Sequence, residues 1–468
     1  MENAPSTHRL AGRACEGMGD YQSAIAQYEQ AIAGYETIRS SFSVEDRAAF
    51  FCNSVAQKPY WGRIRCEARL VQRKQAEMPA LLRACESCRA RQFGELTGEA
   101  PESSVELTPQ NVCAALAPGD LLLYYVLMDR DLLIIAASRD EMKLHLEPLD
   151  QKALTANATK AMECLANPKS SIAEIERAFQ HMSGVLIEPV RSAVAKAGRI
   201  IVVPDGIMTA IPFDLLSLDA SRYTPIVEKM PVRQVPSLRW LVSQQQEEPA
   251  SWPLDYFGVA DPSNAPGRAV LAPGARREAV KVSGSFDPAK TKLLLGREAS
   301  EQAVKSANLA QARYIHFSTH GFLVRDPKEL QSDVTGLVLG KSGSEDGMLT
   351  AAEVRRLRLD ADVCVLSACE TGTGTYVPGE GILSLARSFL LAGSRSVAMT
   401  QWSVNVDSTE ELVVRFFRYR LAGESKGEAL RRAKLDLMTA GNATTRPNTE
   451  SRVWCHPHYW AGFALLGN

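Results

Sequence analysis

Two short segments of this chain end in the same way, and together they restrict the fold more than any other feature. Residues 314–321 read YIHFSTHG and residues 363–372 read VCVLSACETG. Each has a run of strand-forming residues, then a reactive side chain, His320 or Cys369, then a nearby glycine. If the two segments are neighbouring parallel strands in register, their carboxyl ends meet at one edge of the sheet, where sites of such sheets form. We therefore expect His320 and Cys369 to lie side by side.

A cysteine beside a histidine at such an edge suits nucleophilic attack on a carbonyl carbon. The thiolate attacks, and the imidazole accepts the thiol proton and later protonates the leaving amine. A nearby imidazolium also lowers the pKa of the thiol. The oxyanion that forms needs backbone N–H donors, and we expect them from Gly321 and Cys369. The alternative for Cys369 taken alone is a buried structural thiol, since free cysteines are among the most buried residues.

Strands and helices alternate through the C-terminal third, which predicts a mostly parallel sheet flanked by helices on both faces. Thr350 is expected to be the N-cap of a helix, and Gly393 to end another. Upstream, the helical segment 153–197 is expected to break at Asn167-Pro168. The expected strands of the C-terminal third are 314–319, 363–368 and 396–402, and the expected helices are 351–358, 381–392, 408–421 and 426–439.

The first 97 residues have a different pattern, which predicts an α-helical region similar to tetratricopeptide repeats. Ala24 and Ala31 would let two helices approach, and Tyr28 would fill the gap between them. One such match is a weak signal, because any amphipathic helix can place alanine and tyrosine at this spacing. A further helical hairpin is expected over residues 42–71.

The helical region is expected to end at a linker. Residues 98–109 are polar and contain two prolines, which is typical of a connection between domains. After it, two short apolar runs at 121–128 and 132–137 are separated by Asp129-Arg130-Asp131, which predicts a β-hairpin.

Several motifs in fixed order resemble one family. The early signature is Val203-Pro204-Asp205-Gly206 followed by Ile211-Pro212-Phe213, and the histidine and cysteine motifs are HFSTHG at 316–321 and SACETG at 367–372. Gly379-Glu380-Gly381, Trp402-Ser403-Val404 and the run HYWAGF at 458–463 complete the set. With these residues, the chain resembles the CHAT peptidases, relatives of caspases and separase that often follow tetratricopeptide repeats, over residues 110–468.

The resemblance implies an architecture and an activity. The fold would be caspase-like, with a pseudo-protease lobe at 110–250 and an active protease lobe at 251–468, after the repeat-like helical domain at 1–97. His320 and Cys369 would be the catalytic pair of a cysteine endopeptidase that cuts a specific protein partner. The helical region would sense or recruit a protein regulator. The alternative is a catalytically silent scaffold of the same fold that binds proteins.

The expected substrate segment departs from the family pattern. Trp402, Ser403 and Val404 would line the cleft, and we expect the strand 400–404 to hold the substrate as an added β-strand. Relatives that cut after arginine have an acidic residue near here, but Val406 occupies that position and Asp407 lies one step on. A shift of one residue along a strand moves a side chain to the other face. A basic and an apolar P1 residue therefore both remain open. Asp407 is equally suited to cap a helix that begins near Ser408.

Other reactive residues have simpler interpretations. His316 shares strand parity with His320, and we expect a packed or hydrogen-bonded histidine, with tuning of the site as the alternative. Cys364 lies mid-strand and is expected in the core. Cys85-x-x-Cys88 and Cys455-His456-Pro457-His458 are possible metal motifs, but we expect no metal and no cofactor, because the first lies in a helix without further ligands and the second leads into a last strand.

Composition excludes several function classes. The formal net charge is −1, so nothing favours nucleic acid or an anionic membrane as a direct partner. No phosphate-binding motif supports a nucleotide-binding protein. The ten cysteines are scattered through a long chain, which favours reduced thiols over a disulfide framework. The N-terminus lacks the apolar core of a signal peptide, and we expect a soluble, cytoplasmic protein.

Overall fold

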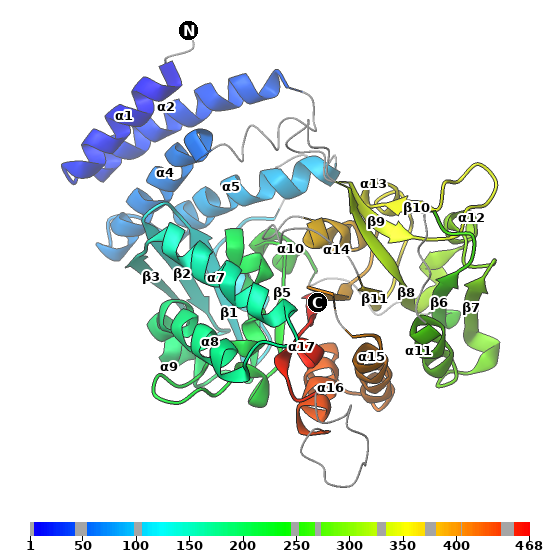
Figure 1. Cartoon of the computed structure of the whole chain (residues 1–468). Helices are drawn as coiled ribbons and strands as arrows, with labels where there is room; N and C mark the ends of the chain where they lie inside the picture. Colours follow the sequence, from blue (N-terminus) through cyan, green and yellow to red (C-terminus); the bar gives the residue numbers. More distant parts are fainter. Residues whose placement is uncertain are drawn as a thin grey trace. The chain divides into compact units, whose positions relative to one another are not determined.

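In the computed structural model, drawn in Figure 1, the chain consists of two compact units. Unit 1 comprises residues 1–152 and 236–246 with a short segment at 325–332, and unit 2 comprises the rest. The expected lobes at 110–250 and 251–468 stay a prediction. The structure describes residues 4–42, 54–97, 105–244, 252–266, 273–324, 334–369, 381–403, 405–440 and 454–468.

Helices form the first part of unit 1, as the sequence predicts. They are α1 (Ala4–Gly17), α2 (Tyr21–Ser40), α4 (Ser54–Gln72) and α5 (Met78–Thr97). The side chain of Asp20 accepts a hydrogen bond from the N–H of Ser23 and so caps α2. The hairpin expected over 42–71 stays a prediction: residues 54–71 belong to one continuous helix, and the preceding part, 43–53, lies outside the described residues.

Tyr28 is the centre of the packing between these helices. Ala24 and Ala31 are fully buried and Tyr28 is 2% exposed. Both Gly12 of α1 and Gly62 of α4 face the tyrosine ring, and a Cβ on Gly62 would lie 2.3 Å from the ring carbon Cζ. Glycine at these two positions leaves the space that the aromatic ring occupies. The expected role of the residues at 24, 28 and 31 is therefore confirmed.

The expected β-hairpin is present and has a third strand. β1 (Asp120–Leu127) and β2 (Asp131–Ala137) pair antiparallel and are buried along their whole length. The strand β3 (Met142–Pro148), which the sequence pattern does not reveal, pairs with β2. Two short helices, α6 (Pro109–Ala114) and α10 (Leu238–Ser243), also belong to unit 1.

Unit 2 contains the mostly parallel sheet that the sequence predicts. Its strands lie in the order β7, β6, β8, β11, β12, β13, β5 and β4, and within this order the pairing of β12 with β13 is antiparallel. Two further strands, β9 and β10, extend from β8 by antiparallel pairing. The bounds are β4 (Arg199–Val203), β5 (Val232–Gln234), β6 (Leu254–Pro262), β7 (Thr291–Gly296), β8 (Ala312–Val324), β9 (Val334–Val338), β10 (Met348–Thr350), β11 (Val363–Cys369), β12 (Ser396–Thr400) and β13 (Phe463–Gly467).

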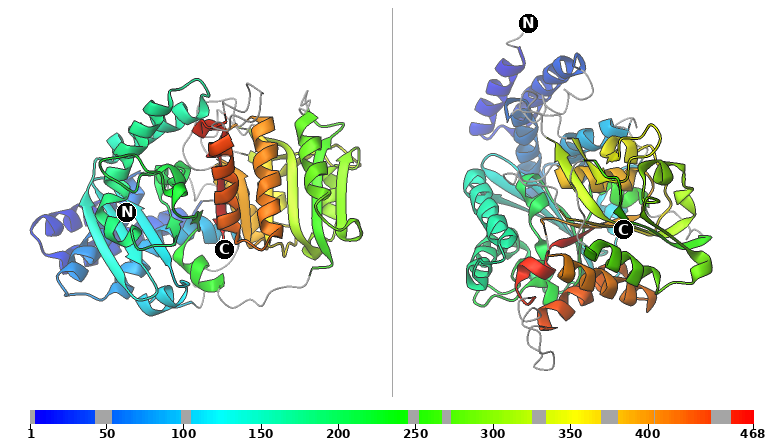
Figure 2. Two further views of the ribbon diagram at one scale, coloured as in Figure 1. Left: turned by 90° about the horizontal axis from the view of Figure 1, so that it is seen from below. Right: turned by 45° about the vertical axis from the view of Figure 1, so that its right-hand side comes forward.

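Helices cover both faces of this sheet (Figure 2). The ring of His316 in β8 faces Phe417 of α15, whereas its neighbour Phe317 faces Phe389 of α14, so the two helices lie on opposite faces. α11 packs on β6 and β8, on the α15 side. The bounds are α7 (Gln151–Ala166), α8 (Ile172–Leu186), α9 (Arg191–Val194), α11 (Pro273–Ser283), α12 (Glu301–Ser306), α13 (Ala351–Val354), α14 (Gly381–Leu391), α15 (Val406–Leu421), α16 (Lys426–Ala440) and α17 (Pro457–Trp460).

Local signals set several of these boundaries. Thr350 caps α13 in a capping box with Glu353, as expected. Gly393 follows α14 with φ +111, a conformation that favours glycine. The strand expected over 396–402 is shorter and ends at Thr400.

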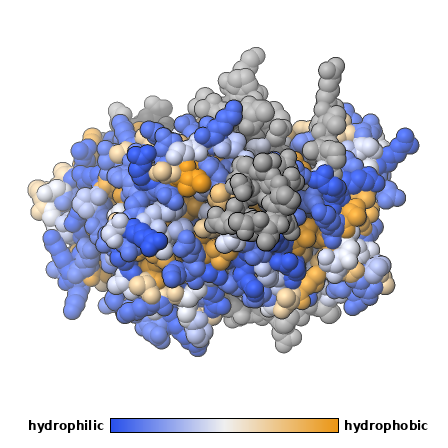
Figure 3. Space-filling model, turned by 60° about the horizontal axis from the view of Figure 1, so that its bottom comes forward, coloured by the Kyte–Doolittle hydropathy of each residue, from blue (hydrophilic) through white to orange (hydrophobic). Residues whose placement is uncertain are grey.

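Polar residues dominate one face of the described surface. On the face drawn in Figure 3 the described residues are mostly hydrophilic, with apolar residues in small scattered groups. No helix in the described ranges is long and apolar enough to cross a membrane.

The packing around Tyr28 predicts a large effect of one methyl group. In Gly62→Ala the new Cβ has no room against the ring, so we expect the free energy of unfolding to fall by about 1–3 kcal/mol. Urea denaturation of the full chain, followed by far-UV circular dichroism, measures this. Gly17→Ala is the control, because a Cβ there meets nothing within 4 Å. Equal stability of the two variants would contradict the packing described for Tyr28.

Candidate functional site

The register between β8 and β11 brings the two motif residues together. The strands pair in parallel without interruption, from Tyr314 with Val363 to His320 with Cys369. Cys369 is the last residue of β11, so this pair lies at the carboxyl edge of the sheet. The structure describes Cys369 by its backbone, and its side chain lies outside the described part. The catalytic roles of both residues stay predictions.

β8 changes its partner directly after His320. Up to that residue it pairs with β11, and from Gly321 onward it pairs antiparallel with β9, beginning with Gly321 opposite Leu337. The side chain of His320 is partly exposed, whereas Gly321 is buried. His320 therefore lies at the position where β8 continues past the end of β11. The assignment of the Gly321 and Cys369 N–H groups to an oxyanion site stays a prediction.

His316 and Cys364 lie in the interior, as expected. His316 is fully buried and forms hydrogen bonds through both ring nitrogens, to Tyr256 and Glu278. Cys364 is fully buried, and burial raises the pKa of its thiol to about 12. Such a thiol is unreactive at neutral pH. The sequence motif alone did not indicate Tyr256 or Glu278. The available signal for Glu278 was its position directly before Ala279, an apolar residue that α11 buries.

The expected substrate segment is not a strand at residues 401–403, and its role in substrate binding stays a prediction. β12 ends at Thr400 and is paired on both sides, with β11 and with β13, so it has no free edge for an added strand. Trp402 is 6% exposed and its indole N–H donates to the carbonyl of His458 at 3.1 Å. Ser403 is exposed. Val404 lies outside the described residues. Residues 401–403 therefore follow the strand rather than extend it.

The two candidates for the specificity position both contact α11. α15 begins at Val406, and its N-cap is Asn405, whose side chain accepts from the N–H groups of Asp407 and Ser408. The suggestion that Asp407 caps this helix is therefore wrong. Val406 packs against Gly274, where a Cβ would lie 1.9 Å from Cγ1 of the valine. The carboxylate of Asp407 accepts a hydrogen bond from Arg277 at 2.5 Å.

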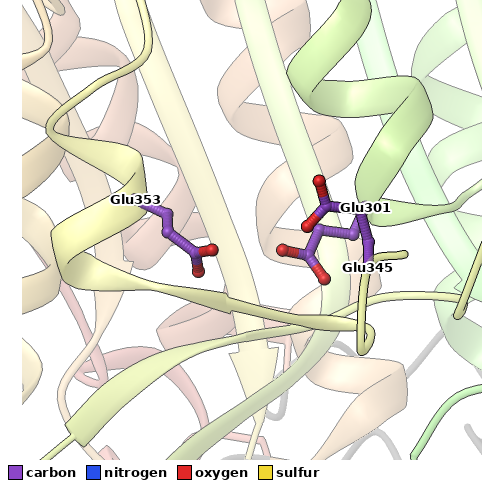
Figure 4. Close-up of side chains that lie close together, drawn as sticks. All are labelled: Glu301, Glu345 and Glu353. Atoms are coloured by element: carbon purple, nitrogen blue, oxygen red, sulfur yellow. The ribbon is translucent and has the colours of Figure 1, made fainter. Parts of the chain in front are cut away.

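Three carboxylates of unit 2 gather around one ammonium group. Glu301, Glu345 and Glu353 have carboxylate oxygens within 4.8 Å of one another (Figure 4). Nζ of Lys305 lies 2.6 Å from Glu301, 2.6 Å from Glu345 and 2.7 Å from Glu353. Burial raises the pKa of Glu301, which is 1% exposed and also accepts from the N–H of Gly347. The lysine occupies the place that a cation would need, so the cluster ties α12, α13 and the β9–β10 connection together.

The histidines near the C-terminus have structural partners. Nδ1 of His456 accepts from the N–H of His458 at 3.1 Å, and its Nε2 donates to the carbonyl of Ser170 at 2.9 Å. Nδ1 of His458 lies 2.8 Å from the carbonyl of Leu165, and burial lowers the pKa of this histidine. Both nitrogens of His456 are thus engaged, which leaves that ring no free ligand atom for a metal. In the part of the chain that the structure describes, the only set of three or more potential metal ligands close enough to share an ion is the glutamate cluster around Lys305.

The fold and the paired strand ends define a caspase-like α/β protein with an N-terminal helical region. Residues 176–468 match the family model "CHAT domain", and the chain belongs to this family.

The chain is also similar to two curated proteins and to a solved structure. Tetratricopeptide repeat protein 28 from Homo sapiens is 26% identical over 341 residues, which are 64% of this chain and 13% of the relative. The Mus musculus protein of the same name is 25% identical over 342 residues, again 64% and 13%. The chain therefore spans about an eighth of the length of these relatives. The crystal structure of the Saccharomyces cerevisiae separase–securin complex matches with a TM-score of 0.50 at 10% identity, over 96% of this chain and 37% of that chain. At this identity the similarity concerns the fold alone.

The cluster around Lys305 predicts a pH-dependent loss of stability when the lysine is replaced. Lys305→Met leaves three neighbouring carboxylates without their ammonium, and we expect a loss of about 1–3 kcal/mol at pH 7, moderated because two carboxylates remain partly in water. The repulsion raises the carboxylate pKa values of the folded variant, so its deficit is complete above them and shrinks as the pH falls through them.

Urea denaturation at pH 7 and at about pH 4.5, close to ordinary carboxyl pKa values, measures the difference between variant and wild type. Arg276→Met is the control, because its guanidinium is 54% exposed and bonds Asp261 at 3.0 Å. A deficit that does not change between the two pH values would contradict the repulsion argument.

Proposed function

We propose that this chain is a cysteine endopeptidase that cleaves a specific protein partner, with Cys369 as the nucleophile and His320 as the base. The observation that supports this most directly is the parallel register that pairs the two residues at the carboxyl edge of the sheet. Membership of the CHAT domain family and the separase-like fold agree with it.

The proposed reaction follows from the chemistry of the two side chains. Nε2 or Nδ1 of His320 accepts the proton of the Cys369 thiol, and the thiolate sulfur attacks the peptide carbonyl carbon. The carbonyl electrons move to oxygen, and the N–H groups of Gly321 and Cys369 stabilise this oxyanion. Collapse breaks the C–N bond, and His320 gives its proton to the leaving amine. Water, deprotonated by the same histidine, then hydrolyses the thioester and restores the thiol.

We propose further that a protein regulator controls this activity through the helical part of unit 1. The relatives are named for tetratricopeptide repeats, and the separase structure is of a complex with a second protein, securin. The described cysteines with described side chains are free thiols, which is usual for proteins of a reducing compartment. We therefore place the protein in the cytoplasm.

The dyad predicts that both residues are required for cleavage. Wild type, Cys369→Ala and His320→Ala are incubated with candidate protein partners and with a peptide library, and new termini are mapped by mass spectrometry. We expect each variant to lose about 10³-fold or more in kcat/KM. Cys364→Ala is the matched control, because Cys364 lies in the same strand but is fully buried. Equal cleavage by Cys369→Ala and wild type would contradict the proposal.

A thiol-reactive peptide probe separates the protease from a scaffold of the same fold. Labelling of Cys369 that depends on His320 is expected for the protease. A scaffold would give weak labelling that is the same with and without the histidine.

The surroundings of Asp407 predict a preference for an uncharged P1 side chain, if residues 402–407 line that pocket as the family resemblance implies. Arg277 already binds Asp407 at 2.5 Å, so this carboxylate is not free to bind a basic P1 group. In Arg277→Gln the carboxylate is released. We expect kcat/KM for basic P1 residues, relative to apolar ones, to rise about tenfold, because a basic P1 group gains about one charge-assisted hydrogen bond.

Profiling with a P1-randomised peptide library measures this ratio. The control is Arg276→Gln, which removes the same charge from the neighbouring position, where the arginine binds Asp261 instead. The same rise in both variants would mean that general electrostatics, and not Asp407, determines the preference.

A further inference from the structure

A buried array of three polar side chains is centred on His316, which precedes His320 by four residues on the same strand. His316 of β8 has its Nε2 2.9 Å from Oε1 of Glu278 on α11, and its Nδ1 2.8 Å from the hydroxyl of Tyr256 on β6. His316 and Tyr256 are fully buried, and Glu278 is 3% exposed. The array therefore connects one helix and two strands of unit 2 inside the core.

The surroundings of this array are otherwise aromatic. The ring of Tyr256 stacks on Phe286 at 5.0 Å, and Phe417 lies 5.8 Å from the ring of His316. Tyr314 joins the same cluster. Burying a carboxylate and an imidazole in such a place costs free energy that well-packed apolar residues would not. Stability alone is thus a poor reason for these residues, and buried titratable groups of this kind gather at functional sites.

The hydrogen bonds of the array can all be made at once. A neutral His316 with its proton on Nε2 donates to Glu278 and accepts at Nδ1 from the hydroxyl of Tyr256. Burial raises the pKa of Tyr256 far above its ordinary value, so the hydroxyl keeps the proton that it donates. Each of the three side chains then fixes the orientation of the next.

The backbone makes room for this arrangement. Gly258 of β6 lies opposite His316 in the register. A Cβ on Gly258 would lie 2.6 Å from Cε1 and 2.7 Å from the hydroxyl oxygen of Tyr256. The absence of a side chain at this position lets the tyrosine lean along its strand and reach the histidine.

The array shares a strand and a face with His320. His316, Ser318 and His320 alternate along β8, so they lie on the face that α11 and α15 cover. Ser318 and Ser367 form the layer between the array and the dyad, and both are buried. The hydroxyl of Ser367 finds no hydrogen-bond partner in the described part of the chain, so this hydroxyl adds no side-chain tie to β8 in this layer.

α11 itself is also held to α15 by two side chains that neighbour Glu278 on the helix. Arg277 and Lys281 both bond the carboxylate of Glu410 on α15, which is 5% exposed. Glu278 is therefore a fixed support rather than a side chain that follows the histidine.

We propose that Glu278, His316 and Tyr256 are positioning residues that fix β8 so that His320 stands correctly beside Cys369. This inference rests on the proposed protease function. The three groups do not touch the reacting atoms. They act through the strand, and a displacement of about 1 Å at a catalytic group is enough to slow a reaction strongly.

The test measures how fast iodoacetamide alkylates Cys369 across pH, because that rate depends on a correctly placed His320. Fragmentation of the labelled peptide separates Cys369 from the buried Cys364. Tyr256→Phe removes one hydroxyl, Glu278→Leu removes the carboxylate, and Glu278→Gln retains an oxygen that accepts from Nε2. We expect the first two to lower the rate at pH 7 about tenfold and to move the pH profile toward that of an ordinary thiol. Glu278→Gln should stay within about threefold of wild type.

Two controls decide what a change means. Asp214→Asn removes the negative charge that pairs with Lys434. The side chain of Lys434 is 1% exposed, so the substitution disturbs a buried polar pair elsewhere in unit 2. It should lower the melting temperature without changing the alkylation rate. Wild-type alkylation in Tyr256→Phe and Glu278→Leu, with the dependence on His320 intact, would overturn the positioning role alone. A rate that falls in all variants in proportion to their melting temperatures would also overturn it. If His320→Ala already reacts like wild type, the proposed function fails, and the positioning role fails with it.

Discussion

The parallel pairing of β8 with β11 is the interaction on which the rest of unit 2 depends. Both strands are buried, and helices cover the sheet on both faces, so neither strand can present a side chain to a protein substrate along its length. Reactive groups can meet a partner only where the strands end. The register places His320 opposite Cys369 at that end. A slip of two residues would preserve the faces and the core pattern but would separate the pair.

Ion pairs between distant parts of the chain help to hold the helices of unit 2 in place. Lys434 of α16 pairs with Asp214, and Lys305 of α12 joins Glu345 and Glu353. Truncating one partner of such a pair leaves the other charge without compensation, and the cost is largest where that charge is buried, as Lys434 is. These ties therefore select one arrangement of helices over others of similar apolar burial. The same reasoning applies to Glu278 and His316.

How much could be predicted from the sequence depends on the range of the interaction. The strand carrying His320 and the strand carrying Cys369 were predicted because each has its own local run of strand-forming residues. The start of α15 was not, since Asn405, Asp407 and Ser408 are all good capping residues, and only the backbone path selects Asn405. Glu278 reads as a solvent-facing residue of an amphipathic helix, and its partner lies 38 positions away. No local pattern contains that contact. β6 and β7 were not predicted either, because strand formation depends strongly on the neighbouring strands.

α11 joins the two parts of the site that the sequence treats as separate. Gly274, Arg277, Glu278 and Lys281 follow one another at the helical spacing of three and four residues, so they lie along one side of the helix. Glu278 reaches the strand of His320, whereas Gly274 and Arg277 contact Val406 and Asp407 at the start of α15. A shift of α11 would therefore disturb the histidine strand and the expected specificity segment together. The array around His316 and the ion pairs at the start of α15 are connected through α11. A substitution in either set of contacts should therefore change the geometry of the other.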